Sequence, residues 1–340
     1  MDIGLAMAVR YHPDHPEPLQ QIYHDFIDEA VYAEQLGFTH IWNGEHHFKI
    51  DAWTPAQFPV LTAIAARTSH IRIGTFILIL PLYHPLRVAE DVAALDLISG
   101  GRFDLGVGVG GGTDHEYQTY GVPLERKWER MYESLDIIKR CFTEDTFDHE
   151  GRFYRFQNVQ MTTKPVQKPY PPIWVAAMGP KSMARAAATG YNSLAGSRPG
   201  YAQEYQAALR EAGHNPDAVQ ISAGPLWIHL AKTREQAWDE AEEGIHWTFE
   251  FYRRYNGPQS TPMMIGLPAV PPVGELRNSP IRGPLIVGTP DDALAFLERF
   301  RDSGLRQIPF DFHHPGQPTS MVRRSMELFA EKVLPVLKTF

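Results

Sequence analysis

The stretch from residue 71 to residue 109, IRIGTFILILPLYHPLRVAEDVAALDLISGGRFDLGVGV, contains two apolar runs, at residues 71–80 and 103–109, with a longer segment between them. Neither run alternates between apolar and polar residues, which is typical of a strand buried on both of its faces. Two such strands joined by a long segment indicate parallel strands that are connected by a helix. The stretch therefore predicts an α/β fold with a covered parallel sheet.

The same alternation of strand-like and helix-like segments continues along the chain. Six further strand-like runs lie at residues 3–7, 40–42, 173–177, 193–195, 219–230 and 307–312. Helical segments with apolar residues three and four positions apart lie between them, such as the one that begins at Leu19 and stops at Gly37. Eight strand–helix units within 340 residues fit a TIM (β/α)8 barrel with insertions. A doubly wound sheet is the alternative.

Two segments interrupt this alternation. Residues 145–172 contain EGRFYRF and then KPVQKPYPP, a pattern that predicts a small hairpin followed by a stiff connector. Residues 256–284 are rich in proline and glycine and show no periodicity. An irregular insertion of that length in a compact domain is usually a lid or is disordered. We therefore predict one barrel domain over residues 1–340 with two insertions, the second of which is a lid.

The composition argues against several classes of protein. The formal net charge of -8 and the lack of any Lys/Arg-rich run argue against a nucleic-acid partner. The first residues have no basic flank before an apolar core, so we expect no signal peptide. The most apolar stretch, residues 71–82, carries Arg72 and is too short to span a membrane. Because Cys141 is the single cysteine, an internal disulfide is excluded. We expect a cytoplasmic protein.

A carboxylate and two imidazoles stand side by side at residues 42–48, WNGEHHF, directly after the second predicted strand. A zinc site of the His-x-x-Glu-His type does not fit, because four residues separate His40 from Glu45, and we predict no metal. No Gly-x-Ser-x-Gly sequence supports a hydrolytic triad. A polar turn is the plain alternative. However, the position after a barrel strand places these residues at the mouth where active sites of this fold are built. His313 and His314 follow the eighth predicted strand and are weaker candidates at the same mouth.

Two other segments indicate binding of a ring or a phosphate. GVGVGG at residues 106–111 matches the dinucleotide pattern, but the carboxylates about twenty residues later, Glu129 and Glu133, fall inside a predicted helix. Its glycines still permit a close approach of the backbone to a planar ring or a phosphate. In AAMGPKSMARAAATG, residues 176–190, Gly179 and Pro180 open a helix whose free amide groups and Ser182 hydroxyl suit a phosphate. An ordinary capped helix is equally compatible with this second segment.

Together these residues resemble the bacterial luciferase-like flavin monooxygenases. The resemblance rests on GFTHIW, EHHF, HPLRVAEDVAALD and SGGRF in combination, followed by VGTPDDALAFL in the expected order, and covers nearly the whole chain. It implies a TIM barrel with a lid-like insertion. It also implies a monooxygenase that uses reduced FMN and O2 to oxidise a small apolar organic substrate, with the flavin supplying the oxygen chemistry.

The resemblance also implies roles for particular residues. His46 corresponds to the catalytic histidine, and Phe76–Ile77 occupies the position of a cis peptide that supports the flavin ring. The implied cofactor-binding residues are Phe76, Ile77, Gly108, Val109, Met178, Gly179, Ser182 and Met183. The implied substrate pocket contains Trp42, Glu45, Phe48, Tyr83 and Tyr117. One position departs from the family pattern, because Val109 stands where the luciferase subunits have an arginine. One phosphate contact is therefore expected to be missing.

The expected partners follow from the same resemblance. No second nucleotide motif is found, so reduced FMN is expected to come from a separate NAD(P)H-dependent flavin reductase. A homodimer is expected, because luciferase-like proteins commonly pair through helices early in the barrel. Two alternatives stay open: a deazaflavin-dependent dehydrogenase of the same fold, which transfers hydride without oxygen, and a catalytically silent flavin-binding homologue. EHHF favours the oxygen-using branch.

Overall fold

The computed structural model describes residues 1–340 except residues 16, 112–113, 195–197, 199, 257–265 and 282. Within this part of the chain, parallel strands close into a ring, because β1 pairs with β2 on one side and with β13 on the other. The ring consists of β1 (Asp2–Met7), β2 (His40–Asn43), β3 (Arg72–Thr75), β5 (Phe103–Gly108), β8 (Ile173–Ala176), β9 (Asn192–Leu194), β10 (Ile221–Ser222) and β13 (Gln307–Asp311). The predicted TIM barrel is confirmed, and the doubly wound alternative is wrong because an open sheet would leave two unpaired edges.

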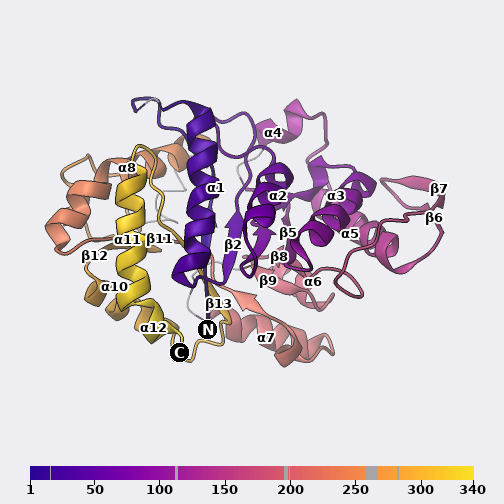
Figure 1. Ribbon diagram of the computed structural model, residues 1–340. Helices are drawn as coiled ribbons and strands as arrows, with labels where there is room; N and C mark the ends of the chain where they lie inside the picture. The colour runs from indigo at the N-terminus through magenta and orange to yellow at the C-terminus, as the bar shows by residue number, and fades with distance from the viewer. Residues whose placement is uncertain (16, 112–113, 195–197, 199, 257–265, 282) are drawn as a thin grey trace.

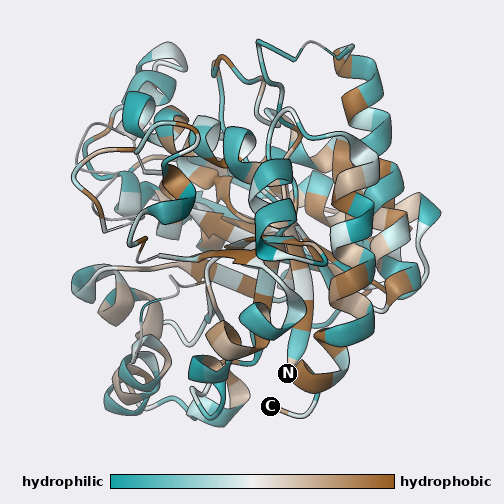
Figure 2. Ribbon diagram, turned by 90° about the vertical axis from the view of Figure 1, so that its left-hand side faces the viewer, coloured by the Kyte–Doolittle hydropathy of each residue, from teal (hydrophilic) through white to brown (hydrophobic). Residues whose placement is uncertain are grey.

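Helices surround the ring and turn their polar residues outward, whereas the strands are apolar (Figure 1, Figure 2). Gly37 ends the first helix in a left-handed conformation, with φ 87°, as predicted. No helix of the described chain is both long and apolar enough to cross a membrane. The helices are α1 (Leu19–Leu36), α2 (Gln57–Arg67), α3 (Pro85–Ser99), α4 (Asp114–Thr119), α5 (Lys127–Thr143), α6 (Pro180–Ala187), α7 (Tyr201–Glu211), α8 (Arg234–Asn256), α10 (Pro290–Leu297), α11 (Thr319–Lys332) and α12 (Leu334–Leu337).

Two tryptophans fill the interior of the barrel. Trp42 on β2 and Trp174 on β8 are each 1% exposed and meet edge to face with ring centroids 5.4 Å apart. Gly74 on β3 lies beside Trp42 in the parallel register, and a Cβ at this position would clash with the indole ring. A small residue on the neighbouring strand therefore leaves room for a large indole, which is how the interior of a small barrel is filled without a pore.

The third barrel strand is interrupted next to Phe76. Both β3 and the short strand β4 (Leu78–Ile79) pair with β5. Between the last pair of β3 and the first pair of β4, this side of the ladder has three residues, 75–77, whereas β5 has two, 105 and 106. The Phe76–Ile77 peptide bond in this bulge is cis, as the resemblance implies. The Thr75 hydroxyl bridges the gap, because it donates to the Gly106 carbonyl at 2.7 Å and accepts from the Gly106 amide at 3.0 Å.

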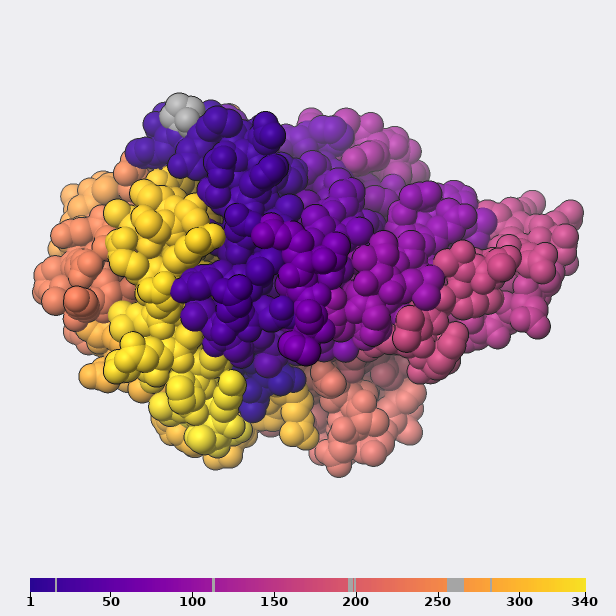
Figure 3. Space-filling view, in the orientation of Figure 1, coloured from indigo at the N-terminus to yellow at the C-terminus, as the bar shows by residue number. Residues whose placement is uncertain are grey.

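The first insertion is a hairpin. Strands β6 (Phe147–Glu150) and β7 (Arg155–Val159) pair antiparallel, and the hairpin projects from the side of the barrel (Figure 1, Figure 3). A proline-rich segment with a cis Lys168–Pro169 bond leads from the hairpin to β8. The predicted hairpin is confirmed, and the stiffness of the connector stays a prediction.

The second insertion, predicted as a lid at residues 256–284, is described only in part, because residues 257–265 and 282 lie outside the described residues. The remainder is not wholly irregular. It contains the 3-10 turn η3 (Leu276–Asn278), in which Leu276 packs on Ala241, Ile245 and Phe249 of α8. Arg277 also binds Glu242 of α8, with Nε 2.8 Å from the carboxylate. This part of the insertion is therefore attached to α8, and its role as a lid stays a prediction.

Two further strand assignments differ from the sequence prediction. The run at residues 219–230 is divided into β10 and β11 (Leu226–Leu230), because Pro225 has no amide hydrogen to continue the ladder. Strand β12 (Leu285–Gly288) was not predicted and pairs with β11 outside the ring. The last residue of the predicted strand at 193–195 lies outside the described residues. Three further single 3-10 turns are η1 (Leu80–Leu82), η2 (Pro216–Ala218) and η4 (Glu298–Phe300).

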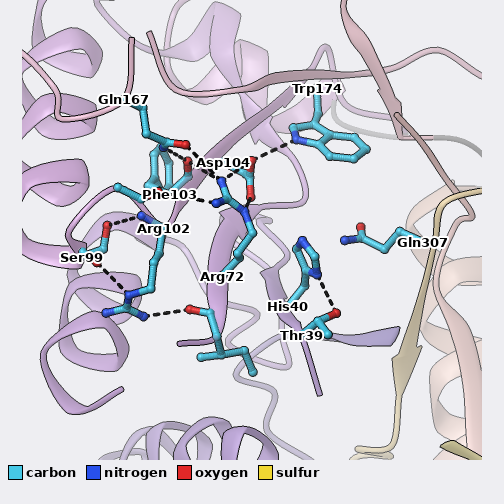
Figure 4. A network of polar contacts seen from close by, with 12 residues as sticks. Thr39, His40, Arg72, Ser99, Arg102, Phe103, Asp104, Gln167, Trp174 and Gln307 are labelled. Atoms are coloured by element: carbon cyan, nitrogen blue, oxygen red, sulfur yellow. Dashed lines mark hydrogen bonds and ion pairs between the residues drawn. The ribbon is translucent and has the colours of Figure 1, made fainter. Parts of the chain in front are cut away.

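A network of polar side chains occupies the end of the barrel where the strands begin (Figure 4). Arg72, the first residue of β3, binds the buried carboxylate of Asp104 at 2.7 Å, and that carboxylate also accepts from the Trp174 indole at 3.3 Å. The Trp42 indole donates to Gln307, the first residue of β13, at 2.7 Å. The side chains at this end bond to one another, and active sites of this fold lie at the opposite end, the mouth where the strands finish.

Candidate functional site

The mouth brings together segments that are far apart in the sequence. The turn 44–54 follows β2, α4 follows β5, and Met178–Gly179 follows β8. Figure 1 shows α4 at the end of the barrel opposite to the two chain termini. The predicted EHH segment therefore lies at the mouth of a barrel, as the sequence indicates.

His46 is held by a carboxylate from another strand–helix unit. Its Nδ1 lies 3.1 Å from Oε1 of Glu116 on α4, and its ring meets Trp53 edge to face at 4.9 Å. The side chain of His46 is 16% exposed, whereas that of Glu116 is fully buried. Nε2 of His46 has no partner within the described part of the chain. The imidazole is thus anchored through one ring nitrogen and open through the other.

His47 faces away from His46 and is bonded through both ring nitrogens. Its Nε2 lies 2.7 Å from Oε1 of Glu45, and its Nδ1 lies 3.1 Å from the hydroxyl of Tyr120. Burial raises the pKa of Glu45, and the hydrogen bond with His47 opposes that rise. Burial, followed by the charge of Glu45, raises the pKa of the neighbouring Tyr83. This second group is closed and polar, which is typical of a structural support.

Glu116 also holds the backbone of the turn. Its Oε1 accepts the amide of His47 at 3.1 Å and lies 3.3 Å from Nζ of Lys49. Burial by itself would raise the pKa of Glu116, but the hydrogen bond and charge of His46, the His47 amide and Lys49 lower it below the usual value. The carboxylate is therefore ionised at neutral pH.

Arg10, from the loop after β1, supports the opposite side of the same turn. Its Nε binds Asp51 at 3.0 Å, and its guanidinium lies 4.5 Å from the ring centroid of Trp53. Trp53 in turn packs on His46. The pair of Arg10 and Asp51 is buried, so the guanidinium fixes Trp53 and indirectly the edge of the His46 ring.

The predicted ring-binding residues lie next to one another at the ends of β3 and β5. The Phe76 amide donates to the carbonyl of Asn43 on β2 at 2.7 Å. Gly108 lies beside Ile77, and a Cβ on Gly108 would clash with the Ile77 side chain. Glycine at this position therefore lets the bulge at Phe76–Ile77 pack against the end of β5.

Val109 does not replace the arginine of the luciferase subunits with another polar group. Its side chain is 6% exposed and belongs to the hydrophobic core. Its carbonyl accepts the Tyr117 hydroxyl at 2.9 Å. Val109 thus contributes only backbone to the mouth.

The start of α6 has the geometry expected of a phosphate cradle. The Ser182 hydroxyl accepts from the Gly179 amide at 3.1 Å and donates to the Gly179 carbonyl at 2.9 Å. The Met183 amide already donates to the Gly179 carbonyl at 2.8 Å, so it is not free for a ligand. The amides of Lys181 and Ser182 have no partner within the described residues, and they are the donors that the helix terminus leaves open.

The predicted substrate-pocket residues separate into two groups. Phe48 is 54% exposed with a positive φ of 57°, and Tyr83 stands beside Glu45 at the mouth. Trp42 lies inside the barrel with its indole bonded to Gln307, and Tyr117 is fully buried. The structure therefore does not bring Trp42 and Tyr117 to an open surface.

Several residues of the mouth were missed from the sequence. Glu116, Lys49, Tyr120 and Arg10 are polar residues in segments with no motif of their own. For Glu116 and Tyr120, the position in the sequence was a signal that could have indicated a place at the mouth, because both residues follow the glycine-rich end of a barrel strand. Among the described residues, no group of three or more His, Cys, Asp or Glu side chains could hold a metal ion.

The chain matches the family model described as luciferase-like monooxygenase over residues 1–307. It is 33% identical over 174 residues to the oxygenase component of flavin-dependent trigonelline monooxygenase from Acinetobacter baylyi, covering 51% of this chain and 48% of that protein. It is 27% identical over 346 residues to F420-dependent glucose-6-phosphate dehydrogenase from Microbacterium testaceum, covering 92% and 93%. The chain spans about half the length of the curated relatives it matches first, 47%, 48% and 55%.

Solved structures have the same fold. A monooxygenase from Streptomyces bottropensis superimposes with a TM-score of 0.83 at 25% identity, covering 99% of this chain and 100% of that chain. The oxygenating constituent of 3,6-diketocamphane monooxygenase from Pseudomonas putida, in complex with FMN, superimposes with a TM-score of 0.81 at 21% identity, covering 98% of both chains.

Proposed function

The chain belongs to the luciferase-like monooxygenase family, and we propose that it is the oxygenase of a two-component system that uses reduced FMN and O2 to oxidise a small apolar organic substrate. A separate NAD(P)H-dependent flavin reductase supplies the reduced FMN in this proposal. We further propose that the protein acts as a cytoplasmic homodimer.

The residues at the mouth fit a flavin. The bulge at Phe76–Ile77 and the glycine at position 108 offer backbone for a planar ring, and the Lys181 and Ser182 amides remain as donors for a phosphate. Asn43 Oδ1, Gln57 Oε1 and Trp53 Nε1 are buried polar atoms without a protein partner in the described chain, which favours a polar ligand near them. Reduced FMN, when bound, supplies the electrons that activate O2.

The observation that carries the proposal is the placement of His46. Its Nδ1 is fixed by a buried carboxylate while its Nε2 remains open, so the ring can hold or release a proton at Nε2. A histidine that only stabilised the turn would be bonded through both nitrogens, as His47 is.

Exposed aromatic side chains at the mouth suit an apolar substrate and the exclusion of water. Phe48 and Tyr120 lie with ring centroids 5.4 Å apart, and both are about half exposed. A substrate that covered them would remove apolar surface from water at the mouth.

Support for a reductase partner comes from a relative whose name describes it as the oxygenase component of a flavin-dependent monooxygenase. The deazaflavin-dependent dehydrogenase is the second candidate, because other relatives over most of the chain are named F420-dependent dehydrogenases. A silent flavin-binding homologue is the third.

One experiment separates these three candidates. Oxygen uptake is measured with chemically reduced FMN against a panel of small apolar alkenes, ketones and alcohols. Hydride transfer without oxygen is measured with reduced deazaflavin and the alkenes or ketones, and with oxidised deazaflavin and the alcohols. We expect substrate-dependent product only with reduced FMN and O2, with no reductase present. Turnover of deazaflavin alone would establish the dehydrogenase, and flavin binding without either reaction would establish the silent homologue.

A further inference from the structure

We propose that Glu116 is the positioning residue for His46: it determines which ring nitrogen of His46 carries the proton. The inference deepens the proposed function and rests on it for its catalytic consequence, but its first test requires neither flavin nor substrate.

One carboxylate oxygen of Glu116 contacts three nitrogen atoms of the turn that follows β2. Oε1 lies 3.1 Å from Nδ1 of His46, 3.1 Å from the amide nitrogen of His47 and 3.3 Å from Nζ of Lys49. The carboxylate is fully buried, so water does not compete for these contacts. Since Glu116 lies on α4, the helix that follows β5 clamps the turn that follows β2.

The chemistry of the carboxylate selects the tautomer of His46. An ionised carboxylate only accepts hydrogen bonds, so the ring nitrogen that faces it must carry a hydrogen. The pKa of Glu116 lies below its usual value, so the carboxylate is ionised at neutral pH. In the neutral imidazole, Nδ1 then holds the hydrogen and the lone pair is at Nε2, the nitrogen left open at the mouth.

Neighbouring charges do not take over this role. The carboxylate of Glu45 binds the ring of His47, and Asp51 binds Arg10, so neither is the partner of His46. Lys49 shares the oxygen of Glu116 and, because it is a cation, has no acceptor to offer Nδ1. Within the described residues, Glu116 is the single hydrogen-bond partner of the His46 ring.

The first test observes the tautomer directly. Ring ¹⁵N signals of His46 are recorded in the protein without flavin, with the signals assigned by their loss in His46→Asn. We expect hydrogen on Nδ1 and a lone pair on Nε2 in the wild type. In Glu116→Ala, Nδ1 loses its acceptor, so nothing holds the hydrogen on Nδ1 and we expect it to move to Nε2.

Glu133→Ala is the matched control. The carboxylate of Glu133 on α5 also accepts one imidazole, from His149 at 3.2 Å, and several backbone amides, those of residues 152–154, but lies at the hairpin. This variant should leave the His46 signals unchanged. A wild-type His46 with its hydrogen on Nε2, or an unchanged tautomer in Glu116→Ala, overturns the proposal.

The second test measures product, peroxide and flavin affinity with reduced FMN and O2. We expect Glu116→Ala to form product about a hundredfold more slowly, the scale for a misplaced acid–base group, while KM and the Kd for FMN stay within about threefold. Glu116→Asp keeps the charge and should recover part of the rate. Wild-type product yield in Glu116→Ala overturns the proposal. If the wild type shows no oxygen uptake, the proposed function fails and the tautomer measurement still decides this inference. Should Glu116→Ala not fold, the wild-type tautomer and Glu116→Asp decide it.

Discussion

Nε2 of His47 lies 2.7 Å from Oε1 of Glu45, while the adjacent imidazole of His46 is bonded to Glu116 through Nδ1 and open at Nε2. Two neighbouring histidines of one turn thus have different environments, since one is enclosed by Glu45 and Tyr120 and the other reaches the mouth. The difference leads to opposite expectations for the two alanine variants.

For His46→Ala, we expect product formation to fall by about a hundredfold or more, because a positioned acid–base group is removed. Folding and flavin binding should remain close to those of the wild type, and release of hydrogen peroxide should rise in place of product. Stopped-flow mixing of reduced flavin-enzyme with oxygen, together with product assays, measures both. Unchanged rate and coupling would contradict the catalytic role of His46.

For His47→Ala, we expect mainly a loss of stability. The variant leaves the carboxylate of Glu45 buried without its imidazole partner, and removal of one member of such a pair costs about 3 kcal/mol. Urea unfolding followed by circular dichroism should show the loss, with His46→Ala as the control. Equal stabilities of the two variants would contradict this assignment, as would a larger loss of activity per folded molecule in His47→Ala.

For Ser182→Ala, we expect weaker binding of FMN by about tenfold, with little change for riboflavin, which lacks the phosphate. The Ser182 hydroxyl caps the first turn of α6 and orients the free amides next to it. Quenching of flavin fluorescence gives both affinities. Thr289→Ala removes a comparable cap from α10 and should leave both unchanged. Equal losses for FMN and riboflavin would place the phosphate elsewhere.

For Asp104→Ala, we expect the free energy of unfolding to fall by about 3 kcal/mol. The buried carboxylate binds Arg72 and the Trp174 indole at the closed end of the barrel, so its loss leaves both donors without this acceptor. FMN affinity at low temperature should stay unchanged, because the network is remote from the mouth. Asp91→Ala removes the exposed pair with Arg87 and should cost about 1 kcal/mol or less. A cost for Asp104→Ala as small as that of this surface control would refute the structural role.

The buried carboxyl of Glu29 on α1 predicts a dependence of stability on pH. Burial raises its pKa to about 8 from 4.5, although Arg323 opposes this rise. The unfolded chain therefore loses this proton at lower pH than the folded chain, so the contribution of Glu29 to stability is lost as pH rises from about 4.5 to 8. Relative to the wild type, Glu29→Gln should gain several kcal/mol between pH 5 and pH 8. Unfolding curves at both pH values measure the gain, and Asp28→Asn, at a half-exposed position of the same helix, should show none.

Most of the barrel could be predicted because a strand that is buried on both faces appears in the sequence as a continuous apolar run. All eight predicted runs contain ring strands, and Gly37 ends α1 as expected. The division of residues 219–230 and the additional β12 could not be predicted, because they depend on which neighbour each strand pairs with. Pairing is a property of the closed ring, and short apolar runs do not encode it.

The sequence by itself determined the alternation of strands and helices, the position of EHH after a strand, and hence a histidine at the mouth of the barrel. The residue pattern around the two histidines did not distinguish His46 from His47, since the two residues are identical and adjacent, and only the family resemblance assigned the role to His46. That choice depends on Glu116, which is 70 residues from His46 in the chain and meets it at 3.1 Å. The pairing of both strands with β3 brings the ends of β2 and β5 together. The buried carboxylate then finds its partner through the packing of α4 over the turn and not through the order of the chain.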